Sequence, residues 1–267
     1  WYAWLRDGKM GGGLAQLASR FIESAPVAVP LQKPRLFRAG WQPDPEKAVF
    51  AVLGLDEHQK VALALVTLRA EGPNSMLMAR LGNSVLPAVW AVHRGKAGLD
   101  VVTSHEANGR TIVVRQTVLD DGTVAVPVKL GEGPSPLVAL GLDPLGAEGP
   151  AVVDVLFGPE GDTRVMTFQR LLLDGGDPVL SHSFALGKLQ PDAPSPEQWT
   201  LAMNRIDRPV VFYKCGAELL VRDLSGGAPR VVDEQAREAG NLGAAMIRTD
   251  VWLFWTDPVQ GLVHRRL

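Results

Sequence analysis

The most unusual acidic residue of this chain interrupts an apolar segment. Asp154 lies within residues 151–157, whose other side chains are all apolar. A carboxylate in such a segment needs partners or a wet channel, because burying an unpaired charge is costly. Two carboxylates across a cleft cleave glycosidic bonds, so Asp154 is a candidate ligand-binding or catalytic acid. The alternative interpretation is a carboxylate satisfied by structural partners or lining a polar channel.

Charged residues also gather at the ends of two expected strands. Arg205 and Asp207 lie at the end of the strand expected over 198–206, and Arg248 ends the strand expected over 243–248. Such side chains are candidates for binding a polar ligand. Surface ion pairs, for example between Arg248 and Asp250, are the plainer interpretation.

The tryptophans are the third group of candidates. Trp41, Trp90 and Trp199 fall on the first strands of the expected strand sets, whereas Trp4, Trp252 and Trp255 fall on second strands. A large flat ring fills the space between twisted sheets, so wedge packing is one interpretation. The other is a platform on which a sugar or a partner's side chain stacks, with Trp90 as the candidate ligand-binding residue.

The common signatures of catalysis are missing from the sequence. Residues 181–183 read Ser-His-Ser, but neighbours on one strand point to opposite faces and cannot form a nucleophile–base pair. The five histidines are dispersed and no metal-binding spacing occurs. Residues 11–13 are glycines without the Lys-Ser/Thr of a phosphate-binding loop, which indicates a turn. We therefore predict no catalytic residue, no metal and no cofactor.

Composition excludes several classes of protein. The 267 residues are 46% hydrophobic, with 27 Lys and Arg against 29 Asp and Glu, which is typical of a soluble globular chain rather than a disordered one. The longest apolar run, 61–68, is far shorter than the roughly 18 residues of a membrane helix. We therefore expect no membrane span. The Lys and Arg residues are scattered along the chain rather than gathered on one face, so we expect no nucleic-acid partner.

Short alternating runs between Gly and Pro residues predict an all-β fold. The strands group into four-stranded meanders, with shorter sets at the two ends of the chain. The four expected sets are 36–42, 48–55, 60–69 and 75–81; 86–93, 99–105, 110–118 and 123–130; 136–143, 151–157, 163–171 and 178–186; and 198–206, 209–215, 218–224 and 229–235. Helix is expected only around 233–239 and, more weakly supported, over 13–22.

The turn between second and third strands recurs at a nearly constant interval. The turns at Asp7, Asp56, Ala107, Glu160, Gly216 and Asp257 are spaced by 49, 51, 53, 56 and 41 residues. A meander repeated at about this period is typical of β-propeller blades, which stack because a single blade cannot bury both of its faces. The six turns predict a six-bladed β-propeller, formed by residues 1–267 as one domain. A β-sandwich would not require this regular spacing.

The ends of the chain hold incomplete sets of strands. Strands are expected over 2–6, 12–18 and 27–31 at the start, without a first strand, and over 243–248, 251–255 and 262–267 at the end, without a fourth. We expect that the chain is a part of a longer one. The lone cysteine, Cys215, is expected to be a buried core residue and leaves the redox compartment open. An extracytoplasmic location, periplasmic or secreted, is favoured.

Two hairpins resemble those of known propellers. The segment 253–267, with Trp255, Thr256 and Asp257 and with Phe254 in place of Tyr, resembles the YWTD repeat of six-bladed propellers. Residues 219–232 are similar to the strand, Gly-rich turn and strand of TolB-like propellers. The resemblance implies that Trp255 packs between blades and that the next two residues bond turn amides. It covers two of six repeats and implies no calcium or ligand specificity.

These observations predict a non-catalytic protein-binding or scaffold module, possibly within a larger assembly. The alternative is a carbohydrate-binding or glycoside-cleaving propeller that uses an axial cleft, because propellers host both kinds of function. A protein partner is therefore expected first and a carbohydrate second. In a larger assembly, the edge over 262–267 is expected to pair with another chain.

Overall fold

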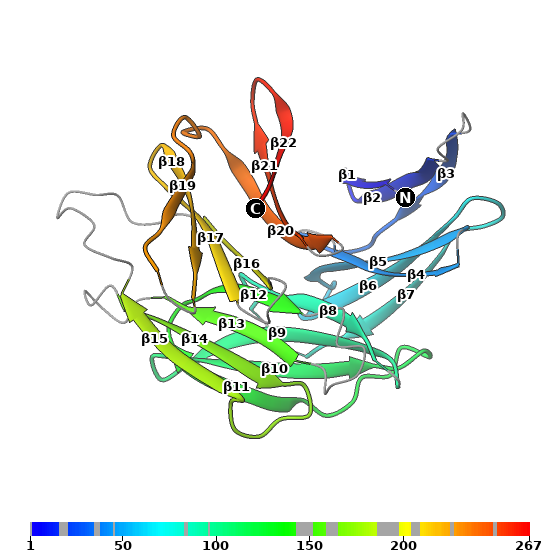
Figure 1. Cartoon of the computed structure of the whole chain (residues 1–267). Helices are drawn as coiled ribbons and strands as arrows, with labels where there is room; N and C mark the ends of the chain where they lie inside the picture. The colour runs from blue at the N-terminus through cyan, green and yellow to red at the C-terminus, as the bar shows by residue number, and fades with distance from the viewer. Residues whose placement is uncertain are drawn as a thin grey trace. The chain divides into compact units, whose positions relative to one another are not determined.

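Antiparallel strands form all of the regular structure in the described part of the chain. The computed structural model describes residues 2–15, 21–34, 38–44, 46–82, 85–95, 97–142, 152–158, 165–185, 198–203, 209–224, 227–247 and 250–267. In these residues six antiparallel sheets of three or four strands follow one another along the chain, and no helix occurs. The all-β class is thus confirmed (Figure 1). It follows that no described segment is a helix able to cross a membrane.

The chain divides into two compact units. The first holds Trp1–His105 and Val114–Val128, and the second holds Glu106–Val113 and Lys129–Leu267. Each unit is described below by itself. That residues 1–267 form a single domain stays a prediction.

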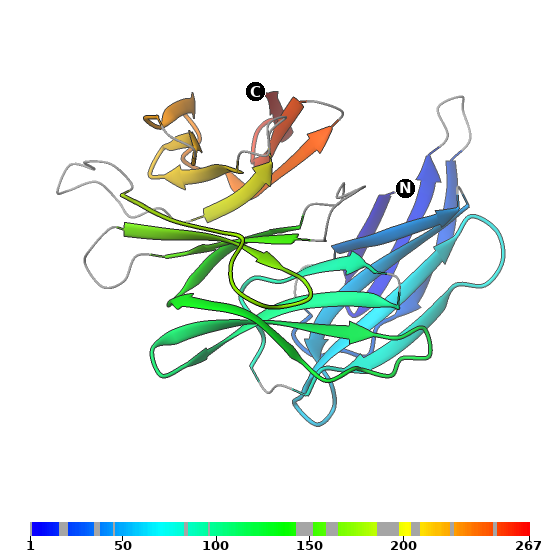
Figure 2. The ribbon, with the colours of Figure 1, turned by 60° about the horizontal axis from the view of Figure 1, so that its bottom comes forward.

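The first three sheets are formed by strands β1 to β11, and each sheet is a simple meander. Figure 2 shows the blue and cyan strands of the second sheet running beside one another. The strands are β1 (Tyr2–Arg6), β2 (Lys9–Ala15) and β3 (Phe21–Ala28); β4 (Arg38–Asp44), β5 (Lys47–Leu55), β6 (Val61–Arg69) and β7 (Ser75–Arg80); and β8 (Ala91–Arg94), β9 (Leu99–Ala107), β10 (Arg110–Val118) and β11 (Val128–Pro134).

The remaining sheets repeat this pattern in the second unit, and the last of them has three strands. The strands are β12 (Leu137–Leu142), β13 (Val152–Phe157), β14 (Val165–Leu172) and β15 (Leu180–Ala185); β16 (Gln198–Met203), β17 (Pro209–Cys215), β18 (Glu218–Asp223) and β19 (Arg230–Asp233); and β20 (Gly240–Ile247), β21 (Asp250–Asp257) and β22 (Gly261–Arg266).

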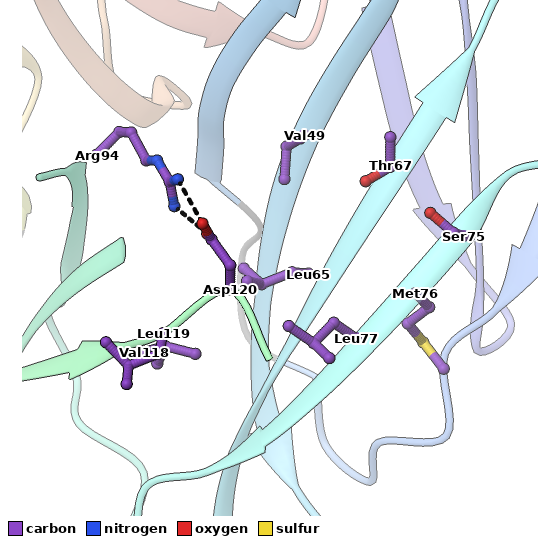
Figure 3. Close-up of a pocket in the computed structure, with 10 residues that line it drawn as sticks. All are labelled: Val49, Leu65, Thr67, Ser75, Met76, Leu77, Arg94, Val118, Leu119 and Asp120. Atoms are coloured by element: carbon purple, nitrogen blue, oxygen red, sulfur yellow. Dashed lines mark hydrogen bonds and ion pairs between the residues drawn. The ribbon is translucent and has the colours of Figure 1, made fainter. Parts of the chain in front are cut away.

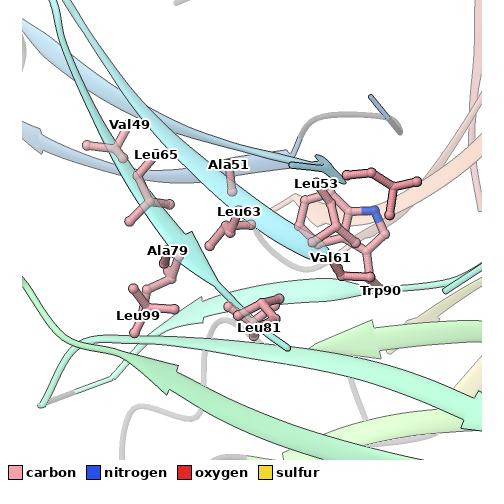
Figure 4. Close-up of a cluster of buried hydrophobic side chains, with 13 residues drawn as sticks. Val49, Ala51, Leu53, Val61, Leu63, Leu65, Ala79, Leu81, Trp90 and Leu99 are labelled. Carbon is pink, nitrogen blue, oxygen red and sulfur yellow. The ribbon is translucent and has the colours of Figure 1, made fainter. Parts of the chain in front are cut away.

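The middle sheet of the first unit is apolar on both faces. Alternate residues of β5, such as Val49, Ala51 and Leu53, belong to a cluster shared with Trp90 and Leu99 (Figure 4). The residues between them belong to a second cluster on the opposite face, shared with strand β2 and the segment after β3. Because successive side chains of a strand point to opposite faces, this sheet is covered on both sides. Burial on two faces replaces the polar–apolar alternation of an ordinary exposed sheet.

The second unit is built in the same way around β17. Val211, Tyr213 and Cys215 pack with strands β13 and β14 on one face, which confirms that the single cysteine is buried. Val210 and Phe212 pack on the other face with Val251, Leu253 and Trp255 of β21. The indole of Trp255 is 1% exposed, and its centroid lies 6.2 Å from that of Phe212. Trp255 therefore packs between neighbouring sheets, as the YWTD resemblance implies.

The predicted turns between second and third strands are confirmed wherever the structure describes them. Asp7-Gly8 and Asn108-Gly109 are two-residue turns in which both φ angles are positive, between 50° and 74°. Such angles suit a hairpin of twisted strands and favour Asn, Asp and Gly. The Asp257 carboxylate accepts hydrogen bonds from the turn amides of Val259 and Gln260, both at 2.8 Å. The turn predicted at Glu160 lies outside the described residues.

Asp56 stabilises its turn in a similar way and is itself buried. Its Oδ1 accepts hydrogen bonds from the backbone N–H groups of His58 and Lys60, both at 2.9 Å, and its Oδ2 lies 2.8 Å from Nε of Arg80. The Lys60 amide lowers the pKa of this carboxyl most, with burial acting against it and the His58 amide and the Arg80 charge assisting. Asp56 is therefore a structural carboxylate at neutral pH.

Several sequence predictions are wrong in detail. The strand expected over 86–93 begins only at Ala91. The expected helix over 233–239 is a turn after β19, and β2 covers the described beginning of the expected helix over 13–22. The strand expected over 27–31, the last of the first set, lies at Phe21–Ala28. Strand β11 begins at Val128 rather than at residue 123, because Pro127 has no N–H group to donate to a strand ladder. Between these positions only Val124 forms a bridge, with Val118.

Truncation of Trp255 tests the packing between sheets. We expect Trp255→Ala to lower the free energy of unfolding by about 3–5 kcal/mol, because it leaves a large cavity in the cluster around Phe212. Val259→Ala is the matched control, since Val259 is 93% exposed in the adjoining turn. Urea denaturation measures both variants, and equal midpoints for the two would contradict this role of Trp255.

The buried phenol of Tyr213 predicts a loss of stability in alkali. Burial raises the pKa of Tyr213 from 10.0 to about 12. The contribution of this phenol to stability is therefore complete below pH 10 and is lost as the pH rises towards 12, because the unfolded chain releases its proton first. Across this interval the wild type should lose stability relative to Tyr213→Phe, as measured by the free energies of unfolding. A difference between the two free energies that stays constant from about pH 10 to about pH 12 would contradict the burial of an un-ionised phenol.

Candidate functional site

Asp154 is neutralised by an arginine of the neighbouring strand. It lies on β13, is 4% exposed, and stands directly opposite Arg170 of β14. Its Oδ1 accepts a hydrogen bond from Nε of Arg170 at 2.8 Å, and its Oδ2 accepts one from Nη2 at 3.1 Å. This two-point geometry is the strongest form of an arginine–carboxylate pair. The buried acid thus has a partner within its own sheet.

A second buried acid, in the first unit, also has polar partners on its own sheet. Asp100, on β9, accepts a hydrogen bond from the hydroxyl of Thr117 at 2.6 Å, and Nε of Arg115 lies 3.8 Å from the same oxygen. A Cβ atom added to Gly95 would lie 2.7 Å from the other oxygen of Asp100. Both acids are therefore enclosed by groups of their own unit. Among the described residues no cluster of three or more His, Cys, Asp or Glu side chains is arranged to hold a metal ion.

Trp90 belongs to the hydrophobic core of the first unit. It directly precedes β8, is 3% exposed, and lies among aliphatic side chains of β5, β6 and β9 (Figure 4). The ring therefore packs between two sheets, as the wedge interpretation predicts. Use of this ring as a stacking platform would require it to leave the core.

The other three candidate ligand-binding residues, Arg205, Asp207 and Arg248, lie outside the described residues. Asp250, which the sequence places beside Arg248, is described. Its Oδ2 lies 3.0 Å from Nη2 of Arg266 on the next strand. Asp250 thus repeats the pattern of an acid on a second strand that pairs with an arginine on the third.

The Ser-His-Ser segment lies on the edge strand β15. His182 stands opposite Phe168, and its ring stacks at 6.3 Å from that of Phe184, two residues further along the strand. The hydroxyl of Ser183 lies 3.3 Å from that of Thr167 on the opposite strand. His182 and Phe184 thus lie on the same face of this edge strand.

One pocket in the first unit was not predicted from the sequence. It has a volume of about 220 Å³ and opens where the core between two sheets ends (Figure 3). Val49, Thr67 and Ser75 are opposite one another across β5, β6 and β7, so the apolar face of this sheet becomes polar at this end. The complete lining is Val49, Leu65, Thr67, Ser75, Met76, Leu77, Arg94, Val118, Leu119 and Asp120.

An ion pair stands at one side of this pocket. Nη1 and Nη2 of Arg94 lie 2.7 and 3.2 Å from the two oxygens of Asp120. The hydrogen bond from Arg94, followed by its charge, lowers the pKa of Asp120, and the same bond raises the pKa of Arg94. A side chain on Gly98 would overlap the carbonyl oxygen of Val118, so this glycine is needed for the close approach of the two segments. Both groups are charged at neutral pH, and their charges cancel.

The pocket therefore suits a small uncharged group. Aliphatic side chains form much of its lining, while Thr67 and Ser75 supply hydroxyl groups that can donate or accept a hydrogen bond. Cavities that bind drug-sized ligands usually measure about 300–1,000 Å³, so this one is small for such a ligand. At Thr67 and Ser75 the sequence shows only that an otherwise apolar strand face ends in polar residues. This pattern is the same whether the polar residues line a pocket or face solvent.

The last sheet offers a second surface, at its edge and on one face. Strand β22 has a single neighbour, β21, in the described part of the chain. Its Leu262 side chain is 69% exposed. On the same face His264 lies 5.4 Å from Trp252 and 6.4 Å from Phe254, between ring centroids. The sequence analysis predicted that this edge, over residues 262–267, pairs with another chain in a larger assembly.

Comparison with known proteins assigns no family. No protein-family model and no curated protein matches the chain. Among solved structures, the chain is similar to a subtype N10 neuraminidase-like protein of A/little yellow-shouldered bat/Guatemala/060/2010, at 11% identity and a TM-score of 0.34. This match covers 87% of the present chain and 85% of the other one. A similarity of this size assigns neither a function nor a site.

The pairing of Asp154 with Arg170 can be tested by removing one partner or both. We expect Asp154→Leu alone to lower the free energy of unfolding by about 3–5 kcal/mol, because it leaves a largely buried cation without its counter-charge. The double variant Asp154→Leu/Arg170→Met should recover most of this loss, since two apolar side chains replace the pair. Chemical denaturation measures both variants. A double variant less stable than Asp154→Leu would show that the two residues do not compensate each other.

Proposed function

We propose that the six sheets are the blades of one six-bladed β-propeller of the YWTD or TolB-like type, and that it acts as a non-catalytic protein-binding or scaffold module. Two features support the blade arrangement. Six meanders follow one another with recurring hairpin turns. The central sheet of each unit is apolar on both faces, as stacking of sheets in a propeller requires.

The observation that carries the binding function is a group of exposed apolar side chains at the last hairpin. Val259, Leu262 and Leu267 are large apolar residues that lie in contact with solvent. Apolar side chains exposed together on one hairpin suit contact with a protein.

The buried acids support a role without catalysis. A glycosidase needs two carboxylates that face one substrate. Asp154 and Asp100 instead each contact an arginine of their own sheet. Among the described residues, the half-buried rings of Trp252 and Phe254 favour carbohydrate binding, because aromatic rings present apolar faces for stacking.

Isolation of the natural protein under mild crosslinking tests this function. We expect a protein partner in fixed stoichiometry by native mass spectrometry, and no binding of the same preparation to a glycan array. Chromogenic glycosides should remain uncleaved by both the wild type and Asp154→Asn. A natural protein with the mass of the single chain, together with glycan binding that Trp252→Ala abolishes, would contradict the proposal and support the carbohydrate alternative.

A further inference from the structure

The floor of the pocket in the first unit is a continuation of the hydrophobic core. All ten lining residues belong to that unit. Val49, Leu65 and Val118 are buried members of the cluster that contains Trp90. Leu77, on the edge strand β7, packs against the same cluster (Figure 3). A group that enters the pocket therefore contacts aliphatic side chains and removes apolar surface from water.

One wall of the pocket is a tight turn that follows β10. The N–H of Gly122 donates to the carbonyl of Leu119 at 2.9 Å and closes this turn. A Cβ atom on Gly122 would lie 3.1 Å from a methyl carbon of Leu77, so the turn packs directly against β7. The two hydrogen bonds between Arg94 and Asp120 tie the same turn to β8. The wall is thus in place before a ligand binds, which lowers the cost of ordering on binding.

The edge of β7 adds backbone groups to the pocket. The N–H of Leu81 donates to the carbonyl of Val61, so residue 81 directs its backbone groups towards β6. Backbone direction alternates along an antiparallel strand, and the register of β6 and β7 is continuous, so the N–H and C=O groups of Met76 point away from β6. No described strand lies on that side of β7. The side chain of Met76 packs against the cluster on the opposite face, so its backbone is the part that reaches the pocket.

The volume of the pocket corresponds to one amino-acid residue of medium size. An engineered cavity of about 150 Å³ encloses benzene, a molecule of six carbon atoms. In the same proportion, the 220 Å³ of this pocket hold about nine heavy atoms. A leucine residue has eight heavy atoms, and half of them form its branched aliphatic side chain. Because Arg94 and Asp120 already neutralise each other, the rim favours no charged ligand.

We propose that the pocket binds a leucine residue within an extended segment of a partner protein. The branched side chain occupies the aliphatic floor. The amide groups on either side of it form hydrogen bonds with the backbone of Met76 and with the hydroxyl groups of Thr67 and Ser75. This inference rests on the proposed protein-binding function and names the chemistry of one contact. Residues that fill such pockets typically dominate the binding energy of an interface.

A leucine with both ends blocked tests the proposal. The probe is acetyl-leucine methylamide, which has a peptide amide on each side of the residue. NMR of the full chain with isotope-labelled leucine methyl groups measures its binding. We expect the signals of Leu65 and Leu77 to shift with a Kd on the order of a millimolar, as suits a ligand of this size. The signals of Leu156, which is buried in the second unit, should stay in place. Unchanged signals of Leu65 and Leu77 would overturn the proposal.

Two matched probes separate the side chain from the amides. Acetyl-asparagine methylamide has nearly the same shape but a polar end, and we expect it to bind at least tenfold more weakly, which corresponds to about 1.4 kcal/mol. Acetyl-N-methyl-leucine dimethylamide lacks both N–H groups, and we expect about fivefold weaker binding from the loss of a hydrogen bond. A matched probe that binds as tightly as the leucine probe would overturn the proposal. Free leucine that binds more tightly than the blocked probe would identify a zwitterionic small molecule as the ligand and would also overturn it.

Filling the pocket from its rim blocks binding without a change in the core. Ser75 is exposed at the rim, so the ring of Ser75→Phe can occupy the pocket, and the leucine probe should no longer shift the signals of Leu65. Val126→Phe is the matched control, because it adds the same ring at a position that is 84% exposed and does not line the pocket. Unchanged urea midpoints show that both variants are folded. Binding of the probe that survives Ser75→Phe, or is lost from Val126→Phe, would overturn the proposal.

The same variants distinguish this inference from the proposed function. A protein partner that co-purifies with the wild type and Val126→Phe, and is lost from Ser75→Phe, supports both. A partner that remains bound to Ser75→Phe supports the protein-binding function and overturns the pocket as its contact. Binding of the probe by a natural protein that has no partner would contradict the protein-binding function. It would also identify a free small molecule as the occupant, which overturns the assignment of the pocket to a partner protein.

Discussion

Burial of both faces of a sheet is the constraint on which the rest of this structure depends. Strands β5 and β17 carry apolar side chains at successive positions, so neither face of their sheets can remain in water. Each sheet is therefore stable only between two others. Burial of apolar area stabilises the fold by about 25 cal/mol per Å² removed from water. A hairpin in isolation does not bury enough apolar area to be stable. Within each unit, a central sheet packed on both faces follows from this requirement.

The same constraint explains where polar groups lie. Within a sheet that is covered on both sides, an acidic side chain must find its partner on an adjacent strand, as Asp154 does with Arg170. In such a pair the charge of the buried carboxylate is balanced by the neighbouring cation. Polar groups that face solvent gather instead where the covered region ends, at Thr67 and Ser75 beside the pocket and along β22. The contacts that we propose with other molecules therefore involve the ends and edges of the sheets.

The sequence predicted local structure well and side-chain partners poorly. Turn chemistry is a property of neighbouring residues, so Asp7-Gly8 and Asn108-Gly109 were sufficient to place their hairpins. Where a strand begins depends also on the strands beside it, and the start of β11 at Val128 was therefore not predicted. Asp154 was recognised as unusual, but Arg170, sixteen residues away, was not identified as its partner. The pocket requires Arg94 and Asp120 to meet across 26 residues, and no pattern in the sequence predicts that contact.

The central claim is that, among the described strands, β22 pairs with β21 alone. Hydrogen exchange of individual backbone amides in the isolated chain, measured by NMR, tests it most directly. The amides of Val263 and Arg265 should be protected by β21, whereas those of Leu262, His264 and Arg266 should exchange faster by about a hundredfold or more, because they point away from the ladder. Equal protection of all five amides would show that another strand already covers this edge, and would contradict the account.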